Sequence, residues 1–131
     1  SSDVCSSDLM IPITAGVVKG PLLNGRILAG GADYQLLVED GRHAHLDARY
    51  VLELDDGSRV FVKNTALRVA SVEDSARIRH GQPVDPARVY FRCQPQMEPS
   101  SEKWLWLAEH QFIGVGMRAP DGVFLSFYKV C

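Results

Sequence analysis

The stretch AHLDARYVLEL, residues 44–54, decides the fold because its side chains alternate between two unlike classes. Its even-numbered positions are apolar or aromatic and include Tyr50, whereas its odd-numbered positions include His45, Asp47 and Arg49. Successive side chains of a β-strand point to opposite faces, so this period of two predicts a long strand with one apolar face. An acid, a base and an imidazole in consecutive odd positions make the other face a candidate binding site.

Turn signals on both sides of this strand predict antiparallel hairpins. EDG at residues 39–41 precedes it and DDG at residues 55–57 follows it, and both are typical of tight turns. Ser71 and Asp74 have the spacing of an approximate capping box, which predicts a single short helix that ends at about His80. Further strands are expected over residues 11–18, 34–38, 59–64, 88–97, 104–117 and 123–130.

Many short antiparallel strands with one helix predict an all-β fold, either a barrel or a sandwich. We expect a single antiparallel β-barrel of about eight strands, because closure removes exposed strand edges. The interior of such a barrel is either filled by side chains or just wide enough for one small ligand. One domain is expected over residues 10–131, and residues 1–9 are expected to be a disordered leader that is not native, with Met10 as the natural start.

Composition argues against several classes of partner. The formal net charge of −2 and the lack of basic runs give no reason to expect nucleic acid. No apolar segment approaches the ~18 residues of a membrane-spanning helix. Three cysteines, Cys5, Cys93 and Cys131, have no metal-like spacing and fit a reducing compartment. We therefore expect a cytoplasmic protein without membrane or nucleic-acid partners, and a homodimer as the commonest homo-oligomer.

The sequence also favours neither a metal nor a cofactor. The glycine pair Gly30 and Gly31 permits a sharp corner, but no helical pattern follows it, as a phosphate-binding loop would require. His43 and His45 could share a face, yet no third ligand stands at a useful spacing. No metal site and no cofactor are expected.

Several motifs together resemble the domain of unknown function 3237 family, also catalogued as uncharacterised protein family 0311. The resemblance extends from Met10 to Val130 and implies a lipocalin-like β-barrel. Some fungal relatives look like polyketide cyclases, which implies lyase or isomerase chemistry. The motifs are GGADYQ (30–35), LDARYVLELDDG (46–57), VKN (62–64), PVDPARVYFR (83–92), WLWLAEHQFIGVG (104–116) and PDGVFLSFYKV (120–130).

The resemblance also implies a set of functional residues. The chain departs from the family pattern at three positions: members commonly have Trp where this chain has Tyr34, and Asn-Arg where it has Ala108 and Glu109. The positions that match the family pattern are Asp33, Asp47, Arg49, Tyr50, Asn64, Arg92 and Trp106.

Acid–base chemistry gives these residues roles. Asp33 or Asp47 is the candidate base that removes a proton next to a carbonyl, which needs a pKa raised by burial. Arg49 or Arg92 is the candidate clamp for a carboxylate or enolate, since a guanidinium offers a fork of donors. His110 is the candidate proton shuttle, sharing one strand face with Trp104, Trp106 and Phe112 as an aromatic pocket wall. Tyr50 and Asn64 complete the substrate-binding set.

Each of these residues could instead have a purely structural role. Asp47 and Arg49 could form an ion pair on a solvated sheet, Asp33 could accept backbone hydrogen bonds at the glycine corner, and His110 could be a wall residue. We expect a small-molecule-binding barrel acting as a cofactor-free cyclase, isomerase or lyase on a carbonyl-rich compound. The alternative is a non-catalytic ligand-binding or structural protein.

Overall fold

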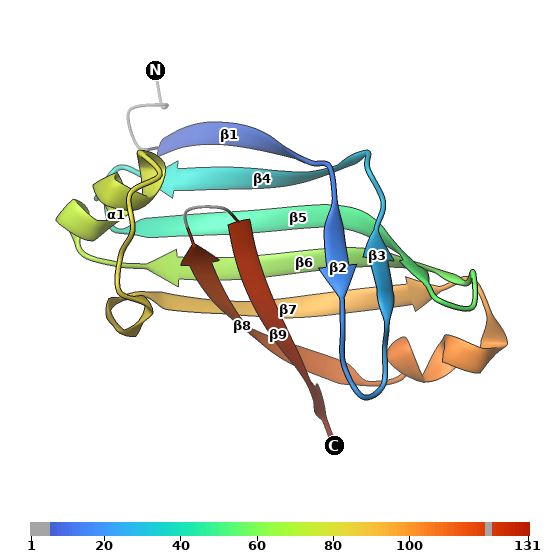
Figure 1. Cartoon of the computed structure of the whole chain (residues 1–131). Helices are drawn as coiled ribbons and strands as arrows, with labels where there is room; N and C mark the ends of the chain where they lie inside the picture. Colours follow the sequence, from blue (N-terminus) through green and yellow to red (C-terminus); the bar gives the residue numbers. More distant parts are fainter. Residues whose placement is uncertain (1–5, 120–121) are drawn as a thin grey trace.

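The computed structural model describes residues 6–119 and 122–131, which form a mostly antiparallel sheet with one α-helix (Figure 1). Helix α1 spans Val72–Arg79, and the 3-10 helices η2 and η3 span Pro86–Arg88 and Glu102–Leu107. The strands are β1 Ser6–Ile13, β2 Gly16–Val18, β3 Gly25–Ile27, β4 Gly31–Val38, β5 His43–Leu54, β6 Arg59–Val69, β7 Tyr90–Pro99, β8 Gln111–Ala119 and β9 Gly122–Val130.

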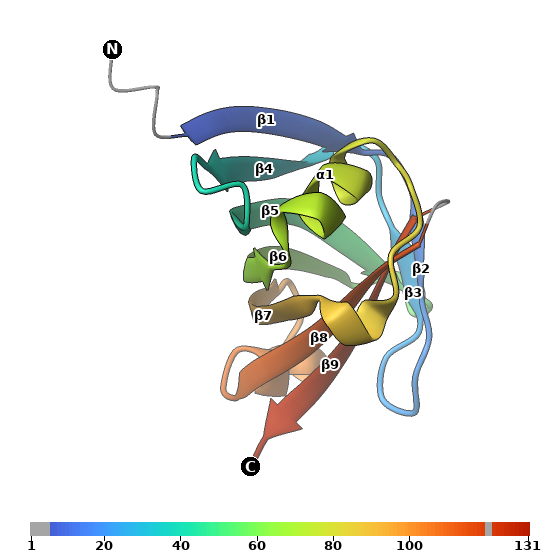
Figure 2. The ribbon, with the colours of Figure 1, turned by 90° about the vertical axis from the view of Figure 1, so that its left-hand side faces the viewer.

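The sheet curls into an open barrel. Its strand order is β1-β4-β5-β6-β7-β8-β9, and the β2–β3 hairpin joins it through β3 and β5. The β2–β3 and β8–β9 hairpins lie opposite the strands β4, β5, β6 and β7 (Figures 1 and 2). Within residues 6–119 and 122–131 no ladder joins β1 to β9, so the barrel is open along that side. The predicted antiparallel β-fold with one short helix is confirmed.

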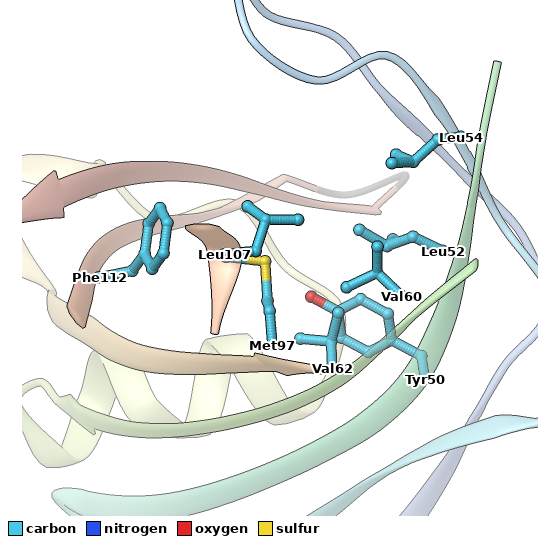
Figure 3. Close-up of a cluster of buried hydrophobic side chains, with 8 residues drawn as sticks. All are labelled: Tyr50, Leu52, Leu54, Val60, Val62, Met97, Leu107 and Phe112. Atoms are coloured by element: carbon cyan, nitrogen blue, oxygen red, sulfur yellow. The ribbon is translucent and has the colours of Figure 1, made fainter. Parts of the chain in front are cut away.

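The central strand β5 buries the face that the sequence predicts. Tyr50, Leu52 and Leu54 on its even face are buried, and they pack against Val60 and Val62 of β6, which have no exposed surface. Figure 3 shows these side chains meeting Met97, Leu107 and Phe112 from β7, η3 and β8. Burying one such side chain contributes about 1.5–3 kcal/mol. This apolar cluster fills the end of the barrel nearer η3.

Both predicted hairpin turns form, and each uses a glycine with positive φ. Gly41 has φ 71° and Gly57 has φ 86°, a region in which only glycine is unstrained. In the second hairpin Asp56 accepts hydrogen bonds from Ser58 N (2.8 Å), Trp104 Nε1 (2.9 Å) and Lys103 Nζ (3.2 Å). These bonds hold the Asp56 pKa well below its usual range and tie the hairpin to η3.

Helix α1 begins as predicted, with Ser71 as its N-cap. The Ser71 hydroxyl accepts a hydrogen bond from Asp74 N at 3.0 Å. The buried Asp74 carboxylate in turn accepts bonds from Arg77 and Arg88, the latter at 2.9 and 3.1 Å. This network ties α1 to η2, and the view along the barrel shows α1 lying across its end (Figure 2).

The structure differs from the predictions near the N-terminus. The strand expected over residues 11–18 is two strands, because Thr14 and Ala15 leave β1 before β2 begins. Of the predicted disordered leader, residues 1–5 lie outside the described residues, whereas residues 6–9 belong to β1 and pair with β4. Backbone pairing satisfies N–H and C=O groups whatever the side-chain pattern, so the leader's lack of periodicity does not prevent it.

The strand expected over residues 104–117 is also wrong in its first half. Trp104 to Leu107 lie in η3, with Ala108 N donating to Leu105 O at 2.9 Å, and β8 begins at Gln111. In a 3-10 helix residues three apart share a side, which lets both Trp104 and Leu107 pack on the core. The alternation in WLWL therefore reflects one helical turn and not a strand.

Strand β9 forms an open edge with exposed apolar side chains. Ile113, Met117, Phe124 and Tyr128 of the β8–β9 hairpin are all exposed. The predicted homodimer stays a prediction.

Among the described residues no helix has the length and apolar character needed to cross a membrane.

Candidate functional site

The polar face of β5 lies on the outside of the barrel. Arg49 donates to Asp47 through Nε at 3.3 Å and Nη2 at 3.2 Å, and both side chains are substantially exposed. This is an ion pair between neighbours on one strand face, the alternative that the sequence left open. An exposed pair of this kind contributes about 0–1 kcal/mol to stability. The base role of Asp47 and the clamp role of Arg49 stay predictions, but both side chains face away from the interior.

The second candidate clamp, Arg92, also faces outward. Its guanidinium stacks 5.1 Å from the centre of the Tyr90 ring and donates to Phe91 O at 3.0 Å. The ladders place Arg92 opposite Leu67, and Arg49 opposite Lys63, four residues away along β6. The two arginines therefore do not converge on one ligand.

His110 and Trp106 form a local pair at the end of η3. His110 Nδ1 lies 2.7 Å from Trp106 O, and the two rings meet edge to face with their centres 6.4 Å apart. Trp106 also contacts Trp104 and Phe112, so these aromatic rings do cluster. The His110 side chain is exposed, and the shared strand face expected for these residues does not exist because η3 replaces the strand.

Asp33, Tyr50 and Asn64, in contrast, all face the interior. The ladders align Asp33, Ala48 and Asn64 in one row across β4, β5 and β6, and directly paired residues share a sheet face. Gln35 occupies the next inward row, and its Nε2 donates to Asp33 Oδ2 at 2.8 Å. These rows lie between the apolar cluster and α1, so the α1 end of the barrel is lined with polar groups.

One further inward row carries a buried cation. Arg68 of β6 pairs with Ala44 and Phe91 and is only 5% exposed. Among the side chains that the structure describes, no carboxylate lies at salt-bridge distance from its guanidinium. Burial and the nearby charge of Arg118 lower the Arg68 pKa, and the Asp33 charge opposes this shift.

Burial shapes the protonation of the other inward groups. It raises the Asp33 pKa above its ordinary value, against the opposing effects of the Gln35 hydrogen bond and the Arg68 charge. Burial likewise raises the pKa of the Tyr50 hydroxyl and of the Cys93 thiol, and a hydrogen bond from Asn64 opposes the shift at Cys93. At neutral pH Tyr50 and Cys93 therefore keep their protons.

Two buried oxygens in the Asp33 row have unused hydrogen-bonding capacity. Asp33 Oδ1 and Asn64 Oδ1 accept no hydrogen bond from any described residue. Buried acceptors in folded proteins are nearly always paired with protein or with ordered water, so these two oxygens are positions where a water or a ligand donor fits. The row can therefore receive hydroxyl or N–H groups of a ligand.

Two β9 side chains beside the inward positions of β8 are exposed to solvent. Val123 and Leu125 of β9 pair with Arg118 and Gly116 of β8 and are 51% and 38% exposed. A void of about 20 Å³, room for about one water molecule, lies between α1 and β8 against Phe91 and Arg118.

A larger hollow lies on the outer face. An open groove of about 520 Å³ crosses β4, β5 and β6 between two rows of outward side chains. Tyr34, Asp47 and Thr65 form one wall, Leu36 and His45 form the other, and strand backbone forms the floor. Within residues 6–119 and 122–131 no group of three His, Cys, Asp or Glu side chains is placed to hold a metal ion.

Sequence reasoning missed Gln35, Arg68 and Arg118 as site residues. Strand β6 was expected to end at Asn64, but it continues to Val69, so Arg68 shares the inward face of Asn64. Counting the even positions of RVFVKNTALRV onward from Val60 would have placed Arg68 there. The same alternation joins Gln35 to Asp33, so the missing information was the strand length.

Solved structures of other proteins have the same fold. A conserved protein of unknown function from Rhodopseudomonas palustris is 35% identical, with a TM-score of 0.91 over 96% of this chain and 86% of that one. A beta-barrel like protein from Acinetobacter baumannii is 38% identical, with a TM-score of 0.76 over 92% and 76%. An enzyme from Penicillium herquei, 20% identical, has a TM-score of 0.69 over 95% and 76% and shows the fold alone.

Sequence comparison agrees with these structures. A UPF0311 protein from Clostridium acetobutylicum is 38% identical over 128 residues, which cover 98% of this chain and 80% of the relative. The family model described as protein of unknown function (DUF3237) matches residues 3–130. The match extends over nearly the whole sequence, as the motifs quoted above predict. The chain therefore belongs to the DUF3237 family.

Proposed function

We propose that this protein binds a carbonyl-rich small molecule in the polar, α1-facing part of the barrel and transfers a proton on it without a cofactor. The observation that carries the proposal is the row of Asp33 and Asn64, whose buried oxygens have no donor among the described residues. The partly hydroxylated or enolic compounds formed from polyketides present donors of this kind. A protein of similar fold from Penicillium herquei is an enzyme, so this type of barrel supports catalysis.

Asp33 has the properties of a general base. Its pKa is raised toward neutral pH, and a general base is most efficient when its pKa lies near the pH at which it works. It would take a proton from the carbon next to a carbonyl, and the electron pair of that C–H bond would move onto the carbonyl oxygen as an enolate. The Tyr50 hydroxyl, which stays protonated, is the candidate donor to that oxygen.

The enolate can then react in two ways, and in each way every proton and electron pair is accounted for. Return of the Asp33 proton to a different atom of the substrate gives an isomer. Attack of the enolate carbon on a second carbonyl of the same substrate closes a ring, and Asp33 returns its proton to the new alkoxide. Neither route needs an oxidant or a metal, so the residues in the barrel supply all the groups involved.

Proton exchange at carbon tests this proposal directly. Deuterium uptake from D₂O into the methyl group of 2′-hydroxyacetophenone, followed by NMR, should be faster with the protein than without it. Asp33→Asn should lower the rate about 10²-fold or more, as expected for loss of a positioned base. Asp47→Asn, on the outer face, is the matched control and should keep the wild-type rate.

The outcomes separate the alternatives. Exchange lost in Asp47→Asn but kept in Asp33→Asn would place the chemistry on the outer face and contradict the proposal. Binding by thermal shift across a panel of aryl ketones, with no exchange in any member, would favour the non-catalytic ligand-binding protein. A ligand at 100 times its dissociation constant adds about 2.7 kcal/mol of stability, which such a screen detects readily.

A further inference from the structure

We propose that the ligand of this interior site carries a carboxylate, or another oxyanion of the same charge, that binds between Arg68 and Arg118. The inference rests on the proposed function, because it names the class of molecule that the same site takes. Its basis is the arrangement of charges inside the barrel.

Arg68 is buried and unpaired among the described residues, unlike the arginines of this protein that form salt bridges. Arg26 pairs with Glu53, Arg49 with Asp47, and Arg77 and Arg88 with Asp74. All of those arginines are at least half exposed or close to it, whereas Arg68 is 5% exposed and has no carboxylate at salt-bridge distance among the described residues. A buried charge without a partner is costly, so this site is built for an anion from outside.

Arg118 extends the positive charge toward the open side. It lies on β8 two residues beyond Gly116, on the same inward face, and is half-buried. It is near enough to Arg68 to disfavour the charged form of that side chain, and Arg79 at the end of α1 adds to the effect. Asp33 is the acid whose charge acts on Arg68 among the described side chains, so described positive charge exceeds negative charge around Arg68.

An aromatic side chain lies beside the two arginines. Phe91 is the partner of Arg68 in the ladder, and Gly116 faces the Phe91 ring from β8. A Cβ at Gly116 would lie 2.8 Å from that ring, so only glycine leaves the ring in place. An aromatic wall beside two guanidinium groups suits a planar carboxylate attached to a conjugated or aromatic body.

This arrangement also orients the substrate for proton transfer. Arg68 is four residues from Asn64 on β6, about 13 Å at 3.3 Å per residue, and its long side chain shortens that span. A ligand anchored by its carboxylate at the arginines would place a carbonyl several bonds away, near Asp33. The class is therefore an oxo acid, with the anion and the reactive carbonyl at opposite ends.

A matched pair of compounds tests the inference. The probes are 3-benzoylpropionate and its amide, which have the same shape and differ in charge, and their affinities are measured by isothermal titration calorimetry. The wild-type protein should bind the acid about tenfold or more tightly than the amide. Arg68→Gln and Arg118→Gln should each reduce this ratio toward one, while Arg92→Gln on the outer face should keep it.

The results distinguish this inference from the proposed function. Equal affinity of the acid and the amide for the wild type, or an acid preference that survives both Arg68→Gln and Arg118→Gln, would overturn the anion class and leave an interior site for neutral ligands. Failure of both compounds to bind would contradict the interior site as well. If Arg68→Gln does not fold, as judged by circular dichroism, Arg118→Gln alone decides the matter, because Arg118 is only half-buried.

Discussion

Replacing Arg68 by methionine should stabilise the ligand-free protein. Arg68 is 5% exposed, and the described residues offer it no salt bridge. Its aliphatic stem packs in the interior, and Met keeps most of that packing while removing the buried charge. The long-range attraction of Asp33 is lost, but so is the repulsion from Arg118 and Arg79.

The magnitude follows from the cost of burying a charge. Replacing buried ionic groups by apolar side chains of similar size stabilises proteins by about 1–4 kcal/mol in favourable cases. Because Asp33 offsets part of the cost, we expect about 1–2 kcal/mol for Arg68→Met. With an unfolding entropy of about 2.1 cal/mol/K per residue over 131 residues, this corresponds to a rise of about 4–7 °C in Tm.

Differential scanning calorimetry at pH 7 without ligand measures the change. The matched control is Arg92→Met, an exposed arginine on the outer face, whose Tm should stay within about 2 °C of the wild type. A fall of several degrees for Arg68→Met would show that Arg68 contributes to folding through contacts of its own. The reasoning about an unpaired cation would then be refuted, and with it the physical basis for an anionic ligand.

Three further predictions follow from the same packing and charges. Asp56→Asn should lower Tm at neutral pH, because Asp56 fixes Trp104 of η3, and since its pKa is depressed the difference should shrink as pH falls through and below 4 in a pH series of melts. Gly114→Ala should lower the free energy of unfolding by about 1–3 kcal/mol, because the added Cβ would overlap Cys93 Sγ. In urea unfolding, the double variant with Cys93→Ala should recover part of that stability, whereas additive losses from the two substitutions would count against this overlap. Asp33 has a raised pKa, so its ionisation costs stability as pH rises above 4; Asp33→Asn should gain on the wild type between pH 4 and 7, and a constant difference would contradict burial as the cause.

Local signals carried much of the fold. The alternation of residues 44–54 predicted the long strand β5, and the DDG and EDG turns predicted its hairpins, because tight turns depend on the residues that form them. Ser71 likewise predicted the start of α1, since an N-cap acts within one helical turn. The WLWL segment failed because a short apolar alternation fits a strand and a 3-10 turn equally well.

Asp33, Tyr50 and Asn64 were predicted as site residues, and the structure brings them to one side of the sheet. Asp47, Arg49 and Arg92 were also predicted from motif positions, yet they lie on the outer face. The alternation along a strand shows which of its residues share a face. It does not show which polar residues the neighbouring strands place beside them. That depends on registers such as Asp33 with Ala48 and Ala48 with Asn64.

The sequence by itself determined where most strands lie, though not where each one begins and ends, and that β5 has one apolar face, because the side-chain period of a strand is local. Only the tertiary structure decided which polar groups are enclosed. The sheet curls toward its apolar face, so Gln35, Asn64 and Arg68 on that face become buried and Asp33 becomes partly buried. Polar residues on the opposite face stay in water and form ordinary ion pairs. Burial is what makes the first group chemically unusual, and burial is a property of the curled sheet and not of any single strand.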